Sequence, residues 1–572
     1  MREGRRARDM METVETDVLI IGSGAGGLTA ALVVAAAGQR ALIVEKAQQW
    51  GGASATSGGM IWIPASAHAL ARGASDSAEE AFDYIRACAD PNIPDANVRA
   101  FVLTAPRMLA WLEANTHVRY RSIPYTDYRQ EVRGAKLGYR THDPVPLDGA
   151  FLGPSLERLR PSAPAALLFN RIAFTMDDVH PLLHRTPGWR RVLLRLLARY
   201  YLDIGQRLKS PRNRFLAAGN ALVGRLGLSV NERNVPFWLD APVVELIRGG
   251  DRPGVTGAIV SRAGGRTRIN TSRAVILATG GFERNAEMRR KYLPGSWNPD
   301  WSGSIESNTG DGIRLAESVG ASVLNMDSAW WGPMLKLPDE SRSRLLTFER
   351  ALPGCIIVNQ AGRRYMNEAC AYDIAGRIMV DADRPGAGTT PSYFLFDQGF
   401  RDRYPVGPLL PGVPRWLHQK GVRQILVKAR TWEVLAARSS LPATTLGATI
   451  ERFNADATRG RDREFARGDS AYDRYYGDPK VTPNPNLGPL QRPPFYAMPI
   501  YPGDIGTNGG LATNEHAQVL DEKHDPIPGL YAVGNTAASV MGHSYPGAGG
   551  TIGPAMTFGF IAAQHSITKD PY

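Results

Sequence analysis

The stretch from Asp17 to Gly59 constrains the fold of this chain more than any other. Its branched, uninterrupted run Val18 to Ile21 predicts a buried parallel strand, because such strands are covered on both faces. An Ala-rich run, Leu28 to Ala37, predicts a helix that Gly38 closes. A second apolar run, Ala41 to Val44, predicts the next strand. Strand, turn, helix and strand in this order predict the first unit of a doubly wound α/β domain.

The turn inside this unit has the spacing of a dinucleotide-binding loop. Gly22, Gly24 and Gly27 read G-x-G-x-x-G, in which the first glycine makes a tight turn and the second lets a pyrophosphate approach the backbone. The third allows the helix to pack on the strand, and the helix N-terminus faces the phosphates. Glu45 ends the second strand, where it can accept both hydroxyls of an adenosine ribose. Together these features predict a dinucleotide site.

Later glycine-rich strand ends predict further contacts with the same ligand. Thr279-Gly280-Gly281 and Gly534-Asn535 each end a predicted strand and bring bare backbone to a ligand. The helix after Ile552 can aim its N-terminus at a ring that becomes anionic on reduction. The residues we expect to bind the dinucleotide are Gly22, Gly24, Ala25, Gly26, Gly27, Glu45, Lys46, Gly52, Ala53, Ser54, Ser57, Gly58, Gly59, Val244, Ala278, Thr279, Gly280, Asp311, Gly534, Asn535, Gly550, Thr551 and Ile552.

The distribution of these signals predicts two domains. At 572 residues the chain is longer than one core usually supports. Nucleotide signals fall in residues 14–327 and 495–572, whereas residues 328–494 are rich in aromatic residues and prolines. We therefore expect an α/β fold in which a Rossmann-type dinucleotide-binding domain carries an inserted α+β domain. The inserted domain would supply a largely apolar substrate pocket.

Composition favours a soluble protein of the cytoplasm. Apolar residues make up 43% of the chain and charged residues 21%, and no apolar run approaches the roughly 20 residues of a membrane-spanning helix. Residues 1–10 are basic, but no apolar segment follows, so we expect no secretory signal. Three scattered cysteines, Cys88, Cys355 and Cys370, argue against a disulfide framework and for a reducing compartment.

A basic segment within residues 149–228 has two interpretations. Residues 185–214 carry nine basic side chains against the single acid Asp203, a net charge of +8, out of +12 for the whole chain. Leucines and Tyr200 recur there at helical spacing beside Arg191, Arg195 and Arg199. The segment either rests on an anionic membrane surface, making the protein peripheral on the inner face of the cell membrane, or packs on its own domain with solvated arginines. Because the charge is local, nucleic acid is not an expected partner.

Several motifs together resemble one family. The amino-terminal fingerprint, the Ala-Thr-Gly-Gly strand end and Tyr-Ala-Val-Gly-Asn (residues 531–535) resemble the fumarate reductase-like flavoproteins, which bind FAD. Within that group, GHSYPGAGGTIGPAMTFGF (542–560), LPGCIIVNQAGRRYMNEACAY (352–372) and IYPGDIGTNGG (500–510) are similar to the 3-ketosteroid Δ1-dehydrogenases. The resemblance covers most of the chain outside residues 149–228, and it implies non-covalently bound FAD and 1,2-desaturation of a 3-ketosteroid.

The same resemblance implies roles for four residues. Tyr545 and the backbone N–H of Gly549 would hold the 3-keto oxygen, which stabilises the enolate that forms on loss of a C2 proton. Tyr372 would remove that proton, and Tyr128 would assist it, with Tyr125 a near alternative. Tyrosine has an ordinary pKa near 10, so Tyr372 needs neighbours that stabilise its phenolate.

Other functions stay open at this point. A Δ4-(5α)-3-ketosteroid dehydrogenase would use the same cofactor and carbonyl anchor, and a fumarate reductase-like enzyme would need arginines and a histidine at the flavin, where only His543 is near Tyr545. A non-enzymatic flavin-containing protein that binds membrane surfaces is a third alternative. No second nucleotide fingerprint is present, so we expect a quinone or similar electron acceptor. We expect no metal site, and we interpret His180 and His184 as solvent-exposed helix residues.

Overall fold

The computed structural model describes residues 11–250, 253–262, 264–295 and 298–568. Our expectation about residues 1–10 therefore lies outside the described residues. The first domain is built on an eight-stranded sheet with β1 at its centre, between β11 and β2. Its strands are β1 (Glu12–Ile21), β2 (Ala41–Val44), β8 (Phe237–Trp238), β9 (Val243–Arg248), β10 (Val255–Arg262), β11 (Gly265–Leu277), β20 (Gln518–Leu520) and β21 (Pro526–Ala532). β21, β11, β1, β2 and β8 run parallel, as the buried apolar runs predict.

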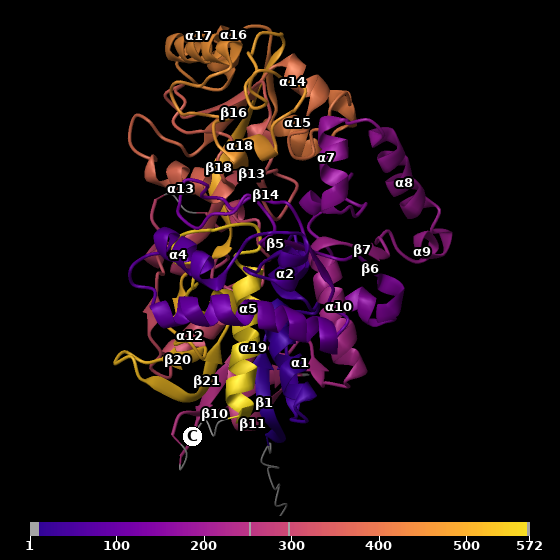
Figure 1. The fold of residues 1–572 in the computed structure, drawn as a ribbon, viewed down its shortest axis with the longest axis vertical. Coiled ribbons are helices and arrows are strands. Elements are labelled where there is room, and N and C mark those ends of the chain that lie inside the picture. Colours follow the sequence, from indigo (N-terminus) through magenta and orange to yellow (C-terminus); the bar gives the residue numbers. More distant parts are fainter. Residues whose placement is uncertain (1–10, 251–252, 263, 296–297, 569–572) are drawn as a thin grey trace, which may run out of the picture.

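Both faces of this sheet are buried, which explains why β1 is apolar without alternation. Val18 and Ile20 of β1 belong to one hydrophobic core, whereas Leu19 and Ile21 belong to a second. The first core also contains residues of α1, α5, α10 and α19, and the second contains residues of α12 (Figure 1). These helices are α1 (Ala25–Ala36), α5 (Asp95–Asn115), α10 (Ala218–Glu232), α12 (Asp311–Glu317) and α19 (Ile552–Thr568).

The second domain is organised around a six-stranded sheet, in which the long strand β18 pairs with three of the other strands. β18 (Phe495–Thr507) pairs antiparallel with β13, β16 and β17, so this sheet extends beyond residue 494. Figure 1 shows this domain above the nucleotide domain, with α16 and α17 at its far end. Its remaining elements are β13 (Ala329–Leu335), β14 (Arg344–Leu345), β15 (Cys355–Val358), β16 (Ser392–Phe396), β17 (Val427–Ala429), α13 (Tyr372–Asp381), α14 (Gln398–Arg403), α15 (Lys420–Ile425), α16 (Trp432–Arg438), α17 (Ala443–Arg459) and α18 (Ala471–Tyr475).

The basic segment folds as short helices at the edge of the molecule. α7 (Met176–His184), α8 (Trp189–Tyr201) and α9 (Ile204–Lys209) project beside the second domain (Figure 1). Leu196 and Tyr200 of α8 form a small core with Ile172, so one face of α8 packs internally. Residues 218–228, the carboxy-terminal part of the expected insertion, belong to α10 and pack against the segment that contains Ser54. A Cβ at Gly219 would lie only 2.1 Å from the carbonyl oxygen of Ser54.

A three-stranded sheet supports the loop that carries two of the predicted tyrosines. Its strands are β3 (Ile61–Trp62), β4 (Tyr120–Ser122) and β5 (Thr141–Pro144), with β5 in the centre. Among the helices that precede β4 in the chain, α2 (Gly52–Thr56) lies next to the glycine-rich turn and α4 (Ala78–Cys88) precedes α5. The loop between β4 and β5 carries Tyr125 and Tyr128, both of which are buried.

Candidate functional site

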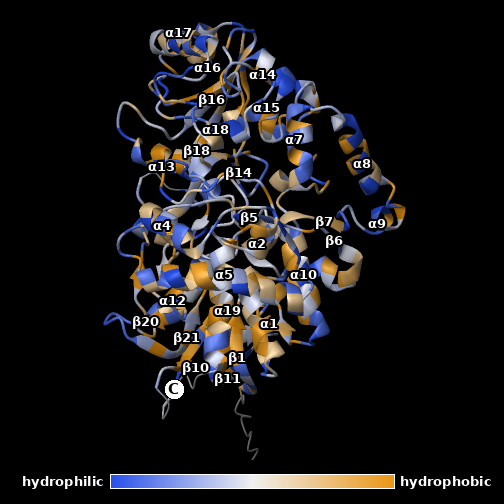
Figure 2. Cartoon of the chain, in the orientation of Figure 1, coloured by the Kyte–Doolittle hydropathy of each residue, from blue (hydrophilic) through white to orange (hydrophobic). Residues whose placement is uncertain are grey.

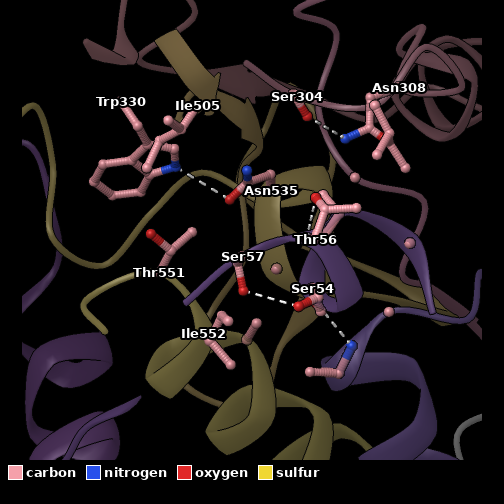
Figure 3. Close-up of a pocket in the computed structure, with 18 of the residues that line it drawn as sticks. Ser54, Thr56, Ser57, Ser304, Asn308, Trp330, Ile505, Asn535, Thr551 and Ile552 are labelled. Carbon is pink, nitrogen blue, oxygen red and sulfur yellow. Dashed lines mark hydrogen bonds between the residues drawn. The ribbon is translucent and has the colours of Figure 1, made fainter. Parts of the chain in front are cut away.

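One large cavity brings the predicted nucleotide and tyrosine residues together. It has a volume of about 510 Å³, and its lining runs from Gly22 in the glycine-rich turn to Tyr372 at the start of α13. Figure 3 shows part of its lining, where Ser54, Asn535 and Thr551 come from segments far apart in the sequence. Parallel strands meet this cavity at their carboxyl ends, the usual place for a ligand in an open α/β sheet.

The backbone around the three glycines of the turn has the geometry that their predicted roles require. Gly22 has φ +108°, and a Cβ there would lie 2.2 Å from the carbonyl oxygen of Ala278. A Cβ at Gly27 would lie 2.3 Å from the carbonyl oxygen of Gly22, so helix and strand pack too closely for a side chain. At Gly24 a Cβ would meet only the Ser54 Oγ, at 3.5 Å. Gly24 therefore leaves room for a ligand rather than for protein, which fits a pyrophosphate on this backbone.

Charged side chains line the nucleotide half of the cavity. Glu45 is buried and accepts hydrogen bonds from the Ser23 N–H at 3.2 Å and the Ser23 hydroxyl at 2.6 Å. Lys46 donates to the Thr309 hydroxyl at 2.7 Å and pairs with Asp311. Both Glu45 and Lys46 line the cavity, so an acid that can hold a ribose is in place.

The remaining predicted nucleotide residues line the cavity with two exceptions. Val244 is 43% exposed and lies outside it, whereas Val243 lines it, because successive side chains of a strand point to opposite faces. Gly550 also lies outside the lining, although its neighbours Gly549 and Thr551 belong to it. Ser54 accepts a hydrogen bond from the Ala25 N–H at 3.1 Å, and Asn535 accepts one from the Trp330 indole at 3.2 Å (Figure 3).

Three buried tyrosines converge in the same cavity. The ring centroid of Tyr128 lies 5.5 Å from that of Tyr545 and 5.6 Å from that of Tyr372. The centroids of Tyr372 and Tyr545 are also 5.5 Å apart, so the three rings form a compact triangle. All three line the cavity, together with Gly549. The sequence places these residues on three separate segments, and the fold brings them to one point.

Hydrogen bonds among these hydroxyls shift their pKa values in both directions. Burial raises the pKa of Tyr372 well above its usual value, and Tyr545 and the Asp373 carboxylate raise it further, whereas a hydrogen bond with Tyr128 lowers it and so favours the phenolate. Burial also raises the pKa of Tyr545, and hydrogen bonds from Thr551, Tyr372 and the backbone of Gly549 oppose that shift. The Thr551 hydroxyl donates to the Tyr545 hydroxyl at 3.1 Å. The Tyr545 hydroxyl and the Gly549 backbone therefore lie close to each other.

Tyr128, rather than Tyr125, contacts the other two tyrosines. The Tyr125 hydroxyl lies 2.9 Å from that of Tyr476 and is turned toward that residue. The backbone N–H of Tyr128 donates to the Pro546 carbonyl at 2.9 Å, which ties it to the loop that carries Tyr545. In the same loop Gly549 has φ +97°, and a Cβ there would lie 2.4 Å from the Ile61 carbonyl carbon.

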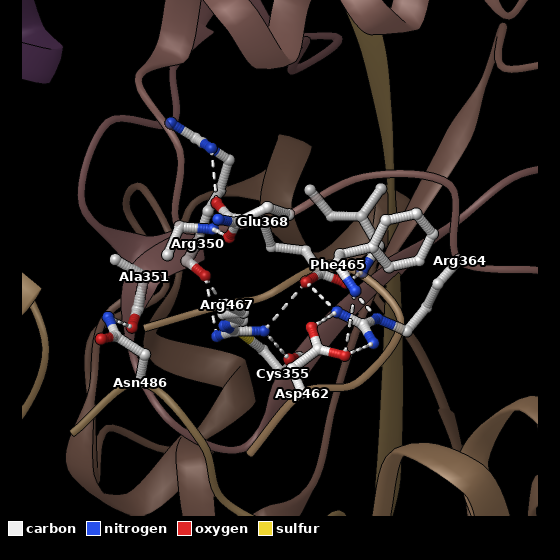
Figure 4. Close-up of polar contacts among 12 residues, drawn as sticks. Arg350, Ala351, Cys355, Arg364, Glu368, Asp462, Phe465, Arg467 and Asn486 are labelled. Atoms are coloured by element: carbon white, nitrogen blue, oxygen red, sulfur yellow. Dashed lines mark hydrogen bonds and ion pairs between the residues drawn. The ribbon is translucent and has the colours of Figure 1, made fainter. Parts of the chain in front are cut away.

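A buried ionic network in the second domain anchors the segment that leads to Tyr372. Arg350 donates to the carbonyl oxygens of Glu368 at 2.6 Å and Cys370 at 3.2 Å, directly before α13 begins. Glu368 in turn pairs with Arg364 at 2.7 Å and Arg467 at 3.3 Å (Figure 4). Although burial raises the pKa of Glu368, the two arginines hold it below its ordinary value. This network fixes the backbone from which Tyr372 projects.

Sequence reasoning missed a group of apolar residues that line the cavity, which we call the roof. They come from residues 163–179, a region without nucleotide signals that precedes the basic residues 185–214. They are Ala163, Ala165, Ala166, Phe174, Met176 and Val179. The apolar residues bounded by prolines in that region were the available signal. Phe348 and Tyr476 of the second domain also line the cavity.

The interpretation of His180 and His184 as solvent-exposed was wrong. His184 is buried and its Nε2 lies 3.2 Å from the Tyr476 carbonyl oxygen, while the His180 ring contacts Tyr475 with centroids 4.9 Å apart. Burial lowers the pKa of both histidines. Among the described residues, no group of three or more His, Cys, Asp or Glu side chains has the arrangement of a metal site. None of the helices in the described residues is long and apolar enough to cross a membrane.

Comparisons with known proteins agree with this geometry. Residues 17–552 match a family described as FAD binding domain. The 3-oxosteroid 1-dehydrogenase of Mycobacterium tuberculosis (strain ATCC 25618 / H37Rv) is 39% identical, over 97% of this chain and 99% of that protein. The 4-oxocyclohexanecarboxylate 2-dehydrogenase of Sinomonas cyclohexanicum is 38% identical, over 96% of this chain and 92% of that protein.

A solved structure extends the match to three dimensions. The 3-ketosteroid Δ1-dehydrogenase of Sterolibacterium denitrificans, in complex with 1,4-androstadiene-3,17-dione, is 42% identical with a TM-score of 0.93. The alignment covers 97% of this chain and all of that one (100%). The cofactor of the family fits the residues present here, because the Gly24 backbone opens to the cavity and Glu45 lies at its rim. The chain belongs to the FAD-binding family of the 3-oxosteroid 1-dehydrogenases.

Proposed function

We propose that this chain is an FAD-dependent enzyme that desaturates ring A of a 3-ketosteroid between C1 and C2. The observation that carries the proposal is the convergence of Tyr372, Tyr128 and Tyr545 in the cavity that the glycine-rich turn also lines. Similarity to 3-oxosteroid 1-dehydrogenases over nearly the whole chain supports it. FAD would be held by the glycine-rich turn, Glu45 and the Gly534–Asn535 strand end, and when bound it accepts the hydride from C1.

In the mechanism that we infer, the residues of the chain remove one proton from the substrate and stabilise the negative charge that develops on its ketone oxygen. The Tyr545 hydroxyl and the Gly549 N–H donate to the 3-keto oxygen, which makes the adjacent C2–H more acidic and stabilises the enolate. The Tyr372 oxygen takes the C2 proton, and Tyr128 donates a hydrogen bond that favours the Tyr372 phenolate. The apolar roof excludes water from the cavity, which strengthens both hydrogen bonds.

Incubating the purified protein with 4-androstene-3,17-dione and an electron-accepting dye tests this function. We expect 1,4-androstadiene-3,17-dione as the product, identified by mass spectrometry and chromatography. A 5α-reduced ketosteroid desaturated at C4–C5, or turnover of a dicarboxylate with a low-potential donor, would support one of the alternatives instead. 4-Oxocyclohexanecarboxylate should be tested in the same panel. The roof side chains Phe174, Met176 and Val179 suit a large apolar ring system better than a small acid, so we expect the steroid to be preferred.

Substitution of Gly24 by Val should abolish cofactor binding while leaving the protein folded. The added side chain would enter the space that faces the ligand, with Ser54 as its only near neighbour. We expect the ratio of flavin to protein absorbance to fall at least tenfold, with an unchanged far-ultraviolet circular dichroism spectrum. Gly205→Ala is the matched control, since a Cβ there meets nothing within 4 Å. Normal flavin content in Gly24→Val would contradict the assignment of this turn to the pyrophosphate.

We further propose that the electrons leave through a membrane-soluble quinone or a similar acceptor, and that α8 and α9 rest on an anionic membrane. Leu202 is 75% exposed and Leu208 84%, and Leu194, Tyr201 and Ile204 are exposed beside them. Figure 2 shows hydrophobic and hydrophilic residues interleaved along α8 and α9 at the edge of the molecule. Most arginines of the segment have internal partners, as Arg195 has with Asp178 and Arg212 with the Leu159 carbonyl. Exposed Arg190, Arg191 and Lys209 remain for lipid headgroups, each worth about 1 kcal/mol at such a surface.

The variant Leu202→Ser with Leu208→Ser should reduce membrane binding. The lost apolar area would enter the bilayer interface in the native protein, so we expect at least a tenfold weaker association with vesicles that contain phosphatidylglycerol. Flotation of the holoenzyme measures this association, and rising salt should weaken it. Leu103→Ser, an exposed leucine on α5, is the control. Equal flotation of the variant and the native protein would contradict docking through α8 and α9.

A further inference from the structure

The residue after each of two catalytic tyrosines belongs to one partly buried ion pair. Arg129 follows Tyr128, and Asp373 follows Tyr372 as the second residue of α13. The Arg129 guanidinium lies 3.9 Å from the Asp373 carboxylate, and the two side chains are 32% and 9% exposed. Backbone N–H groups, among them that of Tyr545, also face the carboxylate. Within the part of the chain that the structure describes, Arg129 Nε and Asp373 Oδ1 are buried without hydrogen bonds.

A buried carboxylate close to a tyrosine raises the pKa of that tyrosine, because it disfavours a second negative charge nearby. The Asp373 carboxylate opposes ionisation of both Tyr372 and Tyr545. Burial raises the pKa of Asp373 to about 6, and Arg129 counters this shift. Arg129 therefore offsets, at short range, a carboxylate that disfavours the phenolate of Tyr372.

We propose that Arg129 and Asp373 are positioning residues that set, as an opposed pair, the ionisation of the base Tyr372. The proposal rests on the function proposed above and adds two residues to its machinery. The pair also joins the β4–β5 loop to the start of α13, so it acts where two of the three tyrosines meet. The other titratable groups that face Asp373 or Tyr372 are Cys370 and Tyr472 at Asp373, and Tyr128 and Tyr545 at Tyr372.

The pair makes a prediction of opposite sign for its two members. The rate of flavin reduction by 4-androstene-3,17-dione should rise with pH to a plateau, and the midpoint of that rise is the quantity to compare. Asp373→Asn keeps the side-chain shape and removes the negative charge, so the midpoint should move about one pH unit lower. Arg129→Gln leaves the carboxylate unopposed, so the midpoint should move about one pH unit higher. The double variant should fall between the two, and Arg129→Lys should recover most of the native midpoint. Rapid-mixing measurements on the holoenzymes between pH 6 and pH 10 give these midpoints.

A second readout does not depend on turnover. Product binding uses the Tyr545 hydroxyl as a donor, so the affinity for 1,4-androstadiene-3,17-dione should begin to fall at a lower pH in Asp373→Asn than in the native protein. Calorimetric titration measures it, and Arg133→Gln, an arginine of the same loop with an 87% exposed side chain, is the control. Midpoints that stay in place, or that move in the same direction in both single variants, would overturn the proposal. A native protein that reduces no flavin with steroid would instead refute the proposed function.

Discussion

Replacing Tyr372 by Phe is expected to slow flavin reduction by about 10²–10⁴-fold while the protein keeps its FAD. The substitution removes only the hydroxyl that lies among those of Tyr128 and Tyr545, so the ring still fills its place in the triangle. Because the ketone donors Tyr545 and Gly549 remain, steroid affinity should change little. Anaerobic mixing of the holoenzyme with 4-androstene-3,17-dione, followed by flavin absorbance, measures the rate.

Tyr393→Phe is the matched control for this prediction. Tyr393 lies on β16, away from the cavity lining, and it loses the same hydroxyl group. We expect a native rate in this variant. If Tyr372→Phe reduced its flavin as fast as the native enzyme, the C2 proton would have another acceptor, and the assignment of the base would be wrong.

Replacing Arg467 by Met should destabilise the second domain by about 3–5 kcal/mol, because it leaves a buried carboxylate without one of its partners. Arg467 is fully buried, and it donates to the carbonyl oxygens of Cys355 at 2.8 Å and Leu352 at 2.8 Å as well as pairing with Glu368 (Figure 4). None of these acceptors gains a new donor in the variant. We expect the melting temperature of the holoenzyme to fall by about 10 °C, measured by scanning calorimetry.

Arg377→Met tests whether the effect comes from burial. Arg377 pairs with Asp381 on α13 at 2.9 Å, but both side chains are about half exposed (42% and 55%). Exposed pairs of this kind contribute about 0–1 kcal/mol, so this variant should melt close to the native protein. Similar melting of the Arg467 and Arg377 variants would show that the buried network contributes little to stability.

The nucleotide half of the site was largely predictable from sequence because its determinants are local. Gly22, Gly24 and Gly27 carry their meaning in their spacing, and Glu45 follows at the end of the next strand. The expectation failed at Val244, where the side chains of a strand alternate and the neighbouring Val243 lines the cavity. A pattern predicts a strand more reliably than it predicts which of two adjacent residues points inward.

The substrate half depends on contacts between distant segments, which no local pattern encodes. The three tyrosines could be named from resemblance, but their triangle needs the β4–β5 loop, α13 and the loop before α19 to meet. The basic segment packs internally through Leu196 and Tyr200, while Leu202 and Leu208 remain exposed. Its docking on a membrane stays a prediction. The contribution of residues 163–179 to the cavity emerged only from the fold.

Anaerobic titration of the yellow holoenzyme with 4-androstene-3,17-dione tests whether the enzyme desaturates ring A with Tyr372 as the base. We expect flavin absorbance to fall in proportion to added steroid and 1,4-androstadiene-3,17-dione to appear in equal amount. In Tyr372→Phe the loss of absorbance should be at least a hundredfold slower. A fully loaded enzyme whose flavin keeps its absorbance through an excess of this steroid would contradict this assignment.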